Sequence, residues 1–228
     1  MRDDAPPAPP PRARRRERSA PIDTELVEGE LRRALGPARA SRAAGRVADA
    51  AHAFANERLD DARRTLAPIA KEAPGASVVR ELLGLTLYQQ GRWRPAAKEL
   101  EAFRDLTGSV DQNPVLADCY RAVGRHADAE ALWDELRSAS PSAELVAEGR
   151  IVAAGSLADR GRIDDAIRLL ESAPRGKKAR EHHLRTAYAL ADLRERAGDV
   201  SRARELFGWI VGVEPGFADA HERLGSLS

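Results

Sequence analysis

The first amphipathic pattern of the chain follows a beginning rich in arginine and proline. Its apolar positions are Ile22, Leu26, Val27, Leu31 and Leu35. Because positions four residues apart share one face of a helix, this pattern predicts an amphipathic helix from Asp23 to Leu35. Asp23 or Thr24 can cap its start with a side-chain oxygen, and the Gly36-Pro37 pair ends it.

After this helix, helical patterns alternate with short turns, and no apolar–polar alternation rich in Val, Ile and Thr predicts a sheet. The turns are Glu57-Arg58, Gly91-Arg92, Gly124-Arg125, Gly161-Arg162 and Gly198-Asp199. An alanine follows each turn, at Ala62, Ala96, Ala129, Ala166 and Ala203, with spacings of 34, 33, 37 and 37 residues. Four residues later comes a large apolar residue, Leu66, Leu100, Trp133, Leu170 or Phe207. The period indicates a repeat protein.

The repeated unit resembles the tetratricopeptide repeat family, whose unit is a helix–turn–helix of about 34 residues. The second unit carries the family pattern as Leu83-Gly84, Gly91, Ala96 and Leu100. The fifth carries it as Ala191, Gly198, Ala203, Phe207 and Pro215. The first unit departs from the pattern, with Glu57 in place of the turn glycine. The fourth lacks the closing proline.

The resemblance implies an all-α fold, an α-solenoid of about five helical hairpins with an N-terminal helix and a C-terminal partial capping helix. The expected organisation has three parts. Residues 1–21 form a disordered Pro/Arg-rich tail, since they have too few apolar side chains to offset the entropy of ordering. Residues 22–42 form the N-terminal helix and a connector. Residues 43–228 form the repeat domain.

Composition limits the function. The 37 Lys+Arg residues balance 36 Asp+Glu residues, so no global basic field recruits nucleic acid. A single cysteine, Cys119, excludes an internal disulfide and a CxxC metal site. No apolar run approaches the ~18–20 residues that span a bilayer. We therefore expect a cytoplasmic protein without membrane contact. Arginine in place of nearly all lysine is typical of bacterial high-GC coding.

No constellation for catalysis is found. The histidines are His52, His126, His182, His183 and His221, and none has the spacing of a zinc site. Adjacent His182 and His183 are expected to point about 100° apart on a helix. The chain also lacks the phosphate-loop, dinucleotide and nucleophile-elbow motifs. We predict no catalytic residue, no metal site and no cofactor.

Other notable residues receive structural roles. We expect Cys119 to be a buried thiol and the tryptophans Trp93, Trp133 and Trp209 to lie mainly in the core. The paired aspartates at the starts of second helices, Asp60-Asp61 and Asp164-Asp165, suit the positive end of the helix dipole. The expected N-cap residues are Asp60, Asp164 and Ser201.

Binding is the better prospect, because the resemblance implies that first helices line a concave groove. The residues predicted to face a partner are Phe54, Glu81, Leu85, Tyr88, Asp118, Arg121, Tyr188 and Asp192. Aromatic and arginine side chains are the types that dominate binding energy. The alternative is that the aromatic members belong to the core. A clamp for a C-terminal carboxylate is not expected, because Val47, Ala51 and Leu82 occupy its positions.

The predicted function is a non-catalytic protein–protein interaction scaffold that binds a peptide or protein segment. A nucleic-acid-associated adaptor is the alternative, because five arginines in the tail can contact phosphates. These are Arg12, Arg14, Arg15, Arg16 and Arg18. A solvated tail is the favoured interpretation of this segment, since no aromatic residues are present to stack on bases.

Overall fold

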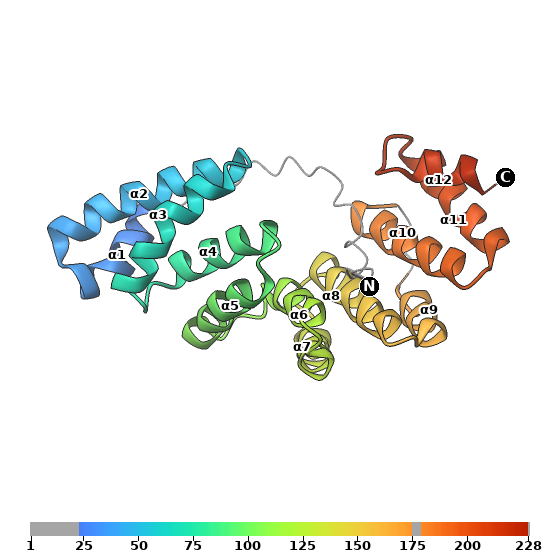
Figure 1. Ribbon diagram of the computed structural model, residues 1–228, viewed down its shortest axis with the longest axis horizontal. Helices are drawn as coiled ribbons and strands as arrows, with labels where there is room; N and C mark the ends of the chain where they lie inside the picture. The colour runs from blue at the N-terminus through green and yellow to red at the C-terminus, as the bar shows by residue number, and fades with distance from the viewer. Residues whose placement is uncertain (1–22, 175–178, 228) are drawn as a thin grey trace, which may run out of the picture. The chain divides into compact units, whose positions relative to one another are not determined.

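The computed structural model describes residues 23–174 and 179–227, which form twelve helices and no strand. The all-α prediction is confirmed. The tail with its arginine cluster lies outside the described residues. The described residues divide into two compact units, 23–124 and 125–227 (Figure 1).

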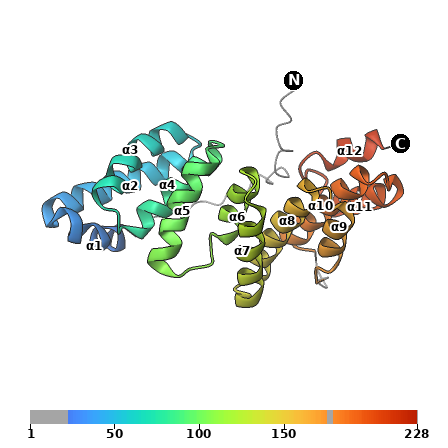
Figure 2. The ribbon, with the colours of Figure 1, turned by 60° about the horizontal axis from the view of Figure 1, so that its bottom comes forward.

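Residues 23–124 contain an N-terminal helix, two complete helical hairpins and the first helix of a third. The helices are α1 (Thr24–Leu35), α2 (Pro37–Ala55), α3 (Leu59–Glu72), α4 (Ser77–Gln89), α5 (Trp93–Thr107) and α6 (Asn113–Ala122). We call the first helix of each hairpin its A helix and the second its B helix. In this unit α2, α4 and α6 are A helices, and α3 and α5 are B helices (Figure 2).

Residues 125–227 begin with α7, which has the sequence pattern of a B helix, and end with a short helix. The helices are α7 (His126–Ala139), α8 (Ala143–Asp159), α9 (Ile163–Glu171), α10 (Glu181–Arg196), α11 (Val200–Val213) and α12 (Ala220–Ser226). The A helices are α8, α10 and the short α12, and the B helices are α7, α9 and α11. The aromatic core between α10, α11 and α12 contains Tyr188, Phe207 and Phe217.

Helix α1 has the predicted bounds. Asp23 is its N-cap residue, and its Oδ1 atom accepts hydrogen bonds from the N–H groups of Glu25 and Leu26 at 3.0 and 3.1 Å. The connector expected up to residue 42 is wrong, because α2 already begins at Pro37. Proline suits this first helical position, where its missing N–H has no partner to lose.

The small and large positions of each hairpin are buried as predicted. The five repeated alanines are at most 1% exposed. The large residues that follow them are also buried, from Leu66 and Leu100 at 0% to Trp133 at 8%. The alanine lets the two helices approach closely, and the large residue fills the space beside it. This repeated contact forms the core of each hairpin.

The turns share one backbone conformation. Gly91, Gly124, Gly161 and Gly198 have φ between 70° and 81°. Glu57 takes the same left-handed conformation, with φ 60°, where the first unit lacks its glycine. The turn of the first unit therefore has the same backbone conformation as the other turns, although Glu57 replaces its glycine.

The expected caps of the B helices are wrong. The N-cap residues of α3, α9 and α11 are Arg58, Arg162 and Asp199. Residues Asp60, Asp164 and Ser201 lie two positions further along, inside the first turn. There the aspartates still face the positive helix end.

The expectation for the tryptophans is wrong in one case. Trp133 is buried and Trp93 is half-buried, but Trp209 is 43% exposed. Trp209 follows buried Phe207 by two residues. Because two residues turn a helix by about 200°, its side chain points away from the core.

Candidate functional site

The positions predicted for a groove all lie on A helices, and we call the surface that carries them the A face of each unit. Tyr88 on α4 is 8% exposed, so the expectation that it is open to a partner is wrong. Its hydroxyl group donates a 2.6 Å hydrogen bond to Asp118 Oδ2 on α6. Its ring meets that of Trp93 edge-on, with centroids 5.4 Å apart. Tyr88 therefore joins two successive A helices.

Asp118 and Arg121 are also buried more deeply than expected. Asp118 is 4% exposed, and Arg121 Nε donates to its Oδ1 atom at 2.8 Å. The side chains of the two residues are 6% and 9% exposed. One carboxylate thus serves both Tyr88 and Arg121, which satisfies a buried charge with two donors. These side chains form a fixed polar floor of the A face.

The half-buried residues on the A face of residues 23–124 are Phe54, Glu81 and Leu85. Gln112 Nε2 donates to Glu81 Oε1 at 2.8 Å. Burial raises the pKa of Glu81, and the negative charges of Asp111 and Glu30 raise it further. Glu81 is therefore held at a position where its negative charge is unfavourable.

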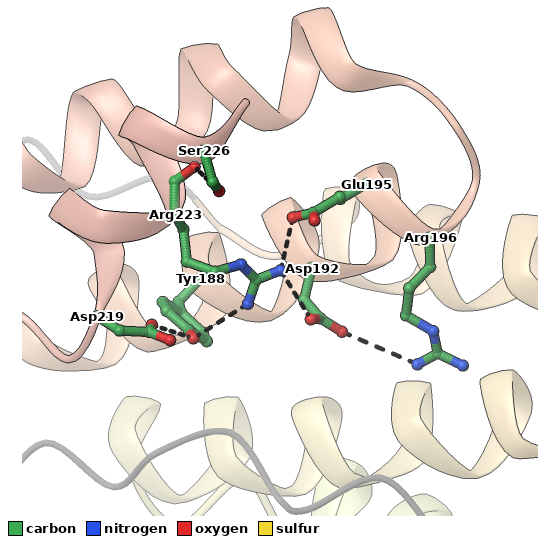
Figure 3. A network of polar contacts seen from close by, with 7 residues as sticks. All are labelled: Tyr188, Asp192, Glu195, Arg196, Asp219, Arg223 and Ser226. Atoms are coloured by element: carbon green, nitrogen blue, oxygen red, sulfur yellow. Dashed lines mark hydrogen bonds and ion pairs between the residues drawn. The ribbon is translucent and has the colours of Figure 1, made fainter. Parts of the chain in front are cut away.

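Residues 125–227 place a larger polar network on their A face, centred on Tyr188 (Figure 3). Tyr188 is 4% exposed, so the expectation that it is open is wrong as well. Its hydroxyl group donates to Asp219 Oδ1 at 2.5 Å. Burial and this hydrogen bond raise the pKa of Tyr188 to about 12. The hydroxyl group therefore stays protonated at neutral pH.

Arg223 of α12 is the central cation of this network, and Arg196 pairs with Asp192 at its edge, with Nη1 and Oδ2 3.9 Å apart (Figure 3). The Nη2 atom of Arg223 donates to Asp192 Oδ1 at 3.1 Å and to Glu195 Oε2 at 2.6 Å. Its Nη1 atom donates to the Tyr188 hydroxyl at 3.3 Å. The guanidinium also lies 4.9 Å from the centroid of the Phe207 ring, a cation–π distance. The result is a charged group held from several sides.

Burial lowers the pKa of Arg223, but its hydrogen bonds to the carboxylates of Glu195 and Asp192 outweigh burial, so the pKa is raised. The network is not closed to solvent. The side chains of Asp192, Glu195 and Arg223 are 38%, 33% and 23% exposed. Asp192 is thus the predicted groove residue of this unit whose side chain is partly exposed. The side chains of Glu195 and Arg223 are partly exposed beside it.

The two tyrosines play the same part in their units. Tyr88 donates to an aspartate 30 residues later, and Tyr188 to an aspartate 31 residues later. Glu81 with Gln112 and Asp192 with Arg223 repeat the 31-residue separation. Each pair joins one A helix to the next. The signal in the sequence is a tyrosine followed by an aspartate about one repeat further on, and Arg223 lies near the second of these.

The histidine and cysteine predictions have mixed outcomes. The rings of His182 and His183 lie 4.1 Å apart, so the expectation that they point apart is wrong. Among the described residues, no three His, Cys, Asp or Glu side chains cluster in a way that could hold a metal ion. The expectation of a buried thiol is confirmed, since Cys119 is 0% exposed. Burial raises its pKa to about 12, so it is no ready nucleophile.

No helix in the described part of the chain combines the length and the apolar character needed to cross a membrane. The predicted phosphate contacts of the tail, Arg12 to Arg18, lie outside the described residues.

Part of the sequence and the fold are similar to known proteins. Residues 188–228 match the sequence model of the tetratricopeptide repeat family. A thermophilic TPR protein of Thermus thermophilus superposes with a TM-score of 0.61 at 20% identity, covering 81% of this chain and 98% of that one. The P58(IPK) TPR domain superposes with a TM-score of 0.46 at 17% identity, covering 90% and 66%. No curated protein matches in sequence.

The fold is therefore an α-solenoid of helical hairpins. Within that class, residues 188–228 match the tetratricopeptide repeat model, and the fold is similar to that of a TPR protein. This fold generally mediates protein–protein interaction, and proteins built on it as scaffolds are generally non-catalytic.

Proposed function

We propose that this protein is a non-catalytic scaffold that holds a peptide or protein segment on the A faces of its hairpins. The observation that carries the proposal is the network around Arg223. It displays the partly exposed carboxylates of Asp192, a predicted groove residue, and of Glu195, three residues later on α10. Both are already fixed by hydrogen bonds, so a bound segment finds acceptors in place and less side-chain freedom is lost on binding.

The buried tyrosines support this proposal indirectly. Tyr88 and Tyr188 fix the spacing between successive A helices rather than offering an open contact. The A face of each unit therefore has a rigid floor, with the half-buried groups Glu81 and Leu85 above it in residues 23–124 and Asp192 above it in residues 125–227. Rigid presentation of a few polar and apolar groups suits recognition of a segment.

The test is an affinity pull-down from source-cell lysate with the full chain and nuclease treatment. The test variant is Asp192→Asn/Glu195→Gln, which removes two charges while keeping side-chain shape. The matched control is Glu205→Gln/Glu214→Gln, two exposed positions at α11, a B helix of the same unit. Partners that survive nuclease, persist in the control and are lost in the test variant support the proposal.

Partners that disappear with nuclease would instead support the adaptor hypothesis for the arginine-rich tail. Equal capture by the test and control variants would contradict an A-face contact at Asp192 and Glu195. Alanine variants of Tyr88 and Tyr188 are unsuitable here, because they remove buried side chains and leave Asp118 and Asp219 without their donors.

A further inference from the structure

Helix α1 lies against the A helices of its own unit. It packs along α2 and also touches α4 (Figure 2). Val47 and Ala51 on α2, at the positions of the carboxylate clamp that is not expected here, are buried at 0% and 7% exposure. A groove that is open along α2 leaves such positions accessible. We therefore place α1 on the A face of residues 23–124.

The start of α4 takes a hydrogen-bond acceptor from α1. Its N-cap residue, Ala76, has no side-chain acceptor, and its first turn holds no acidic residue. Glu30 of α1 supplies both: Ser77 Oγ donates to Oε1 at 2.5 Å, and the Val78 N–H donates to Oε2 at 3.1 Å. A carboxylate there satisfies free N–H groups and complements the positive helix end.

The position of Glu30 coincides with the predicted groove. Glu81, a groove residue, follows Ser77 by one turn of α4. The charge of Glu30 is close enough to contribute to the raised pKa of Glu81, after burial, the bond from Gln112 and Asp111. The carboxylate of Glu30 thus lies at the start of α4, near a predicted groove residue.

Helix α1 packs along α2 but buries few of its own side chains fully. Its fully buried side chains are Val27 and Leu31, while Leu26 is 57% exposed. Helix α4, in contrast, buries residues along most of its length. An element that buries few side chains opens more readily than the hairpins beneath it.

We propose that α1 is a detachable internal ligand of the A face of α2 and α4. The partner that replaces it is an amphipathic helix with one carboxylate between two apolar side chains, in the arrangement of Val27, Glu30 and Leu31. This rests on the proposed function, since it takes the A face as a binding surface. The N-terminus of α4 binds the carboxylate of the partner, and the surface beneath α1 binds its two apolar side chains.

Occupation by α1 has a measurable consequence. A site that is free in only about 1% of molecules binds its partner about 100-fold more weakly than a free site does. Releasing α1 should therefore strengthen binding in trans by roughly 10- to 100-fold.

The probe is a fluorescein-labelled synthetic peptide with residues 23–36 of this chain, titrated with full-length protein and followed by fluorescence anisotropy. Leu31→Asp in the full chain places a charge in the buried stripe of α1 and releases it. This variant should bind the peptide roughly 10- to 100-fold more tightly than wild type. Leu26→Asp is the matched control, because the same change falls on the exposed side of α1. It should bind like wild type.

Two further variants test the carboxylate contact. A Glu30→Lys peptide should bind the released chain at least about tenfold more weakly, since the helix dipole disfavours a cation there. Ser77→Asp, combined with Leu31→Asp in the chain, should abolish binding. The new aspartate repels the peptide carboxylate while itself suiting the first turn of α4, so α4 keeps its helix.

Three outcomes would overturn the proposal. The first is a Leu31→Asp chain that is folded by circular dichroism but does not bind the peptide. The second is equal binding by wild type, Leu26→Asp and Leu31→Asp. The third is a Leu31→Asp chain whose hairpins unfold, since α1 would then be integral to the unit. Hydrogen exchange of the wild-type chain gives an independent reading, with faster exchange expected in α1 than in α4.

The pull-down variant Asp192→Asn/Glu195→Gln concerns the other unit. Failure of the peptide experiment with retained, carboxylate-dependent partner capture would therefore sink the inference and leave the proposed function standing. Peptide binding as expected, together with no partner capture that depends on Asp192 and Glu195, would support the inference and contradict the proposed contact at those two residues.

Discussion

Gly84 of α4 faces Leu100 of α5 so closely that a Cβ atom at Gly84 would lie 2.7 Å from Leu100 Cδ2. A real Cβ atom does not approach another carbon this closely, so an alanine here would force the Leu100 side chain or one of the two helices to shift. The glycine therefore suits this close contact, within a helix whose backbone could accommodate alanine.

The substitution Gly84→Ala should lower the free energy of unfolding by about 1–3 kcal/mol, the usual cost of overpacking a core. The measurement is chemical denaturation followed by circular dichroism. Gly45→Ala is the matched control, because Gly45 lies inside α2 with nothing within 4 Å of the added carbon. It should stabilise by about 0.5–1 kcal/mol through helix propensity. Equal effects of the two changes would contradict the close contact.

Glu57 occupies a left-handed turn position with φ 60°. A side chain in this conformation costs about 1–2 kcal/mol, partly offset by the larger unfolded-state entropy of glycine. Glu57→Gly should therefore raise the free energy of unfolding by up to about 1 kcal/mol, measured as a shift of the denaturation midpoint.

The reverse change gives the control for Glu57. Gly161 has φ 75° and open space around its missing Cβ atom. Gly161→Ala should destabilise through the backbone alone. A neutral result at Gly161 together with no gain at Glu57 would show that these turns relax freely.

Tyr188 should make stability fall at alkaline pH. Its pKa is raised to about 12 in the folded chain by burial and by the bond to Asp219, while an exposed tyrosine titrates near pH 10. The unfolded chain loses this proton first, so the stabilisation is complete below about pH 10 and is lost as pH rises through about 12. Tyr188→Phe should lack this decline between pH 10 and 12.

Denaturation curves at several pH values test this, with the absorbance of ionised tyrosine as a second reading. Near neutral pH the phenylalanine variant should be less stable by about 1–3 kcal/mol, because Asp219 loses a donor. An unchanged alkaline titration in Tyr188→Phe would contradict the assignment of the raised pKa.

The ionised carboxylate of Glu81 should lower the free energy of unfolding at neutral pH. Its pKa is raised by burial and by nearby negative charges, so its contribution to stability is present at low pH and is lost as pH rises through the folded pKa. Glu81→Gln should therefore stabilise the chain at pH 7. The gain should vanish below about pH 4, where the carboxyl group is protonated in both states.

The control for Glu81 is Glu25→Gln, an exposed position on α1. It should show no comparable gain at pH 7. Loss of stability in Glu81→Gln at pH 7 would mean that the bond from Gln112 needs the full negative charge.

The sequence predicted the hairpins well because close helix packing depends on residue size at a fixed register. Ala96 and Leu100 recur in kind in every unit, so their burial could be read from the period. The role of Tyr88 could not be predicted in this way. A repeat template assigns a residue to a face, but it does not say that Asp118 on the next A helix accepts a hydrogen bond from the tyrosine. The position of Glu30 was equally hidden, since Ser77 lies 47 residues away and no period relates them.

Cys119 is a natural thiol probe for the opening of residues 23–124. The sequence holds no other thiol, and this one is completely buried on α6, with its pKa raised to about 12. A thiol reagent can reach it only after the surrounding structure opens, so the labelling rate reports the opening frequency of this unit. The native chain can thus be followed without an introduced label, and a variant that loosens α4 to α6 should show it as faster modification of a single residue.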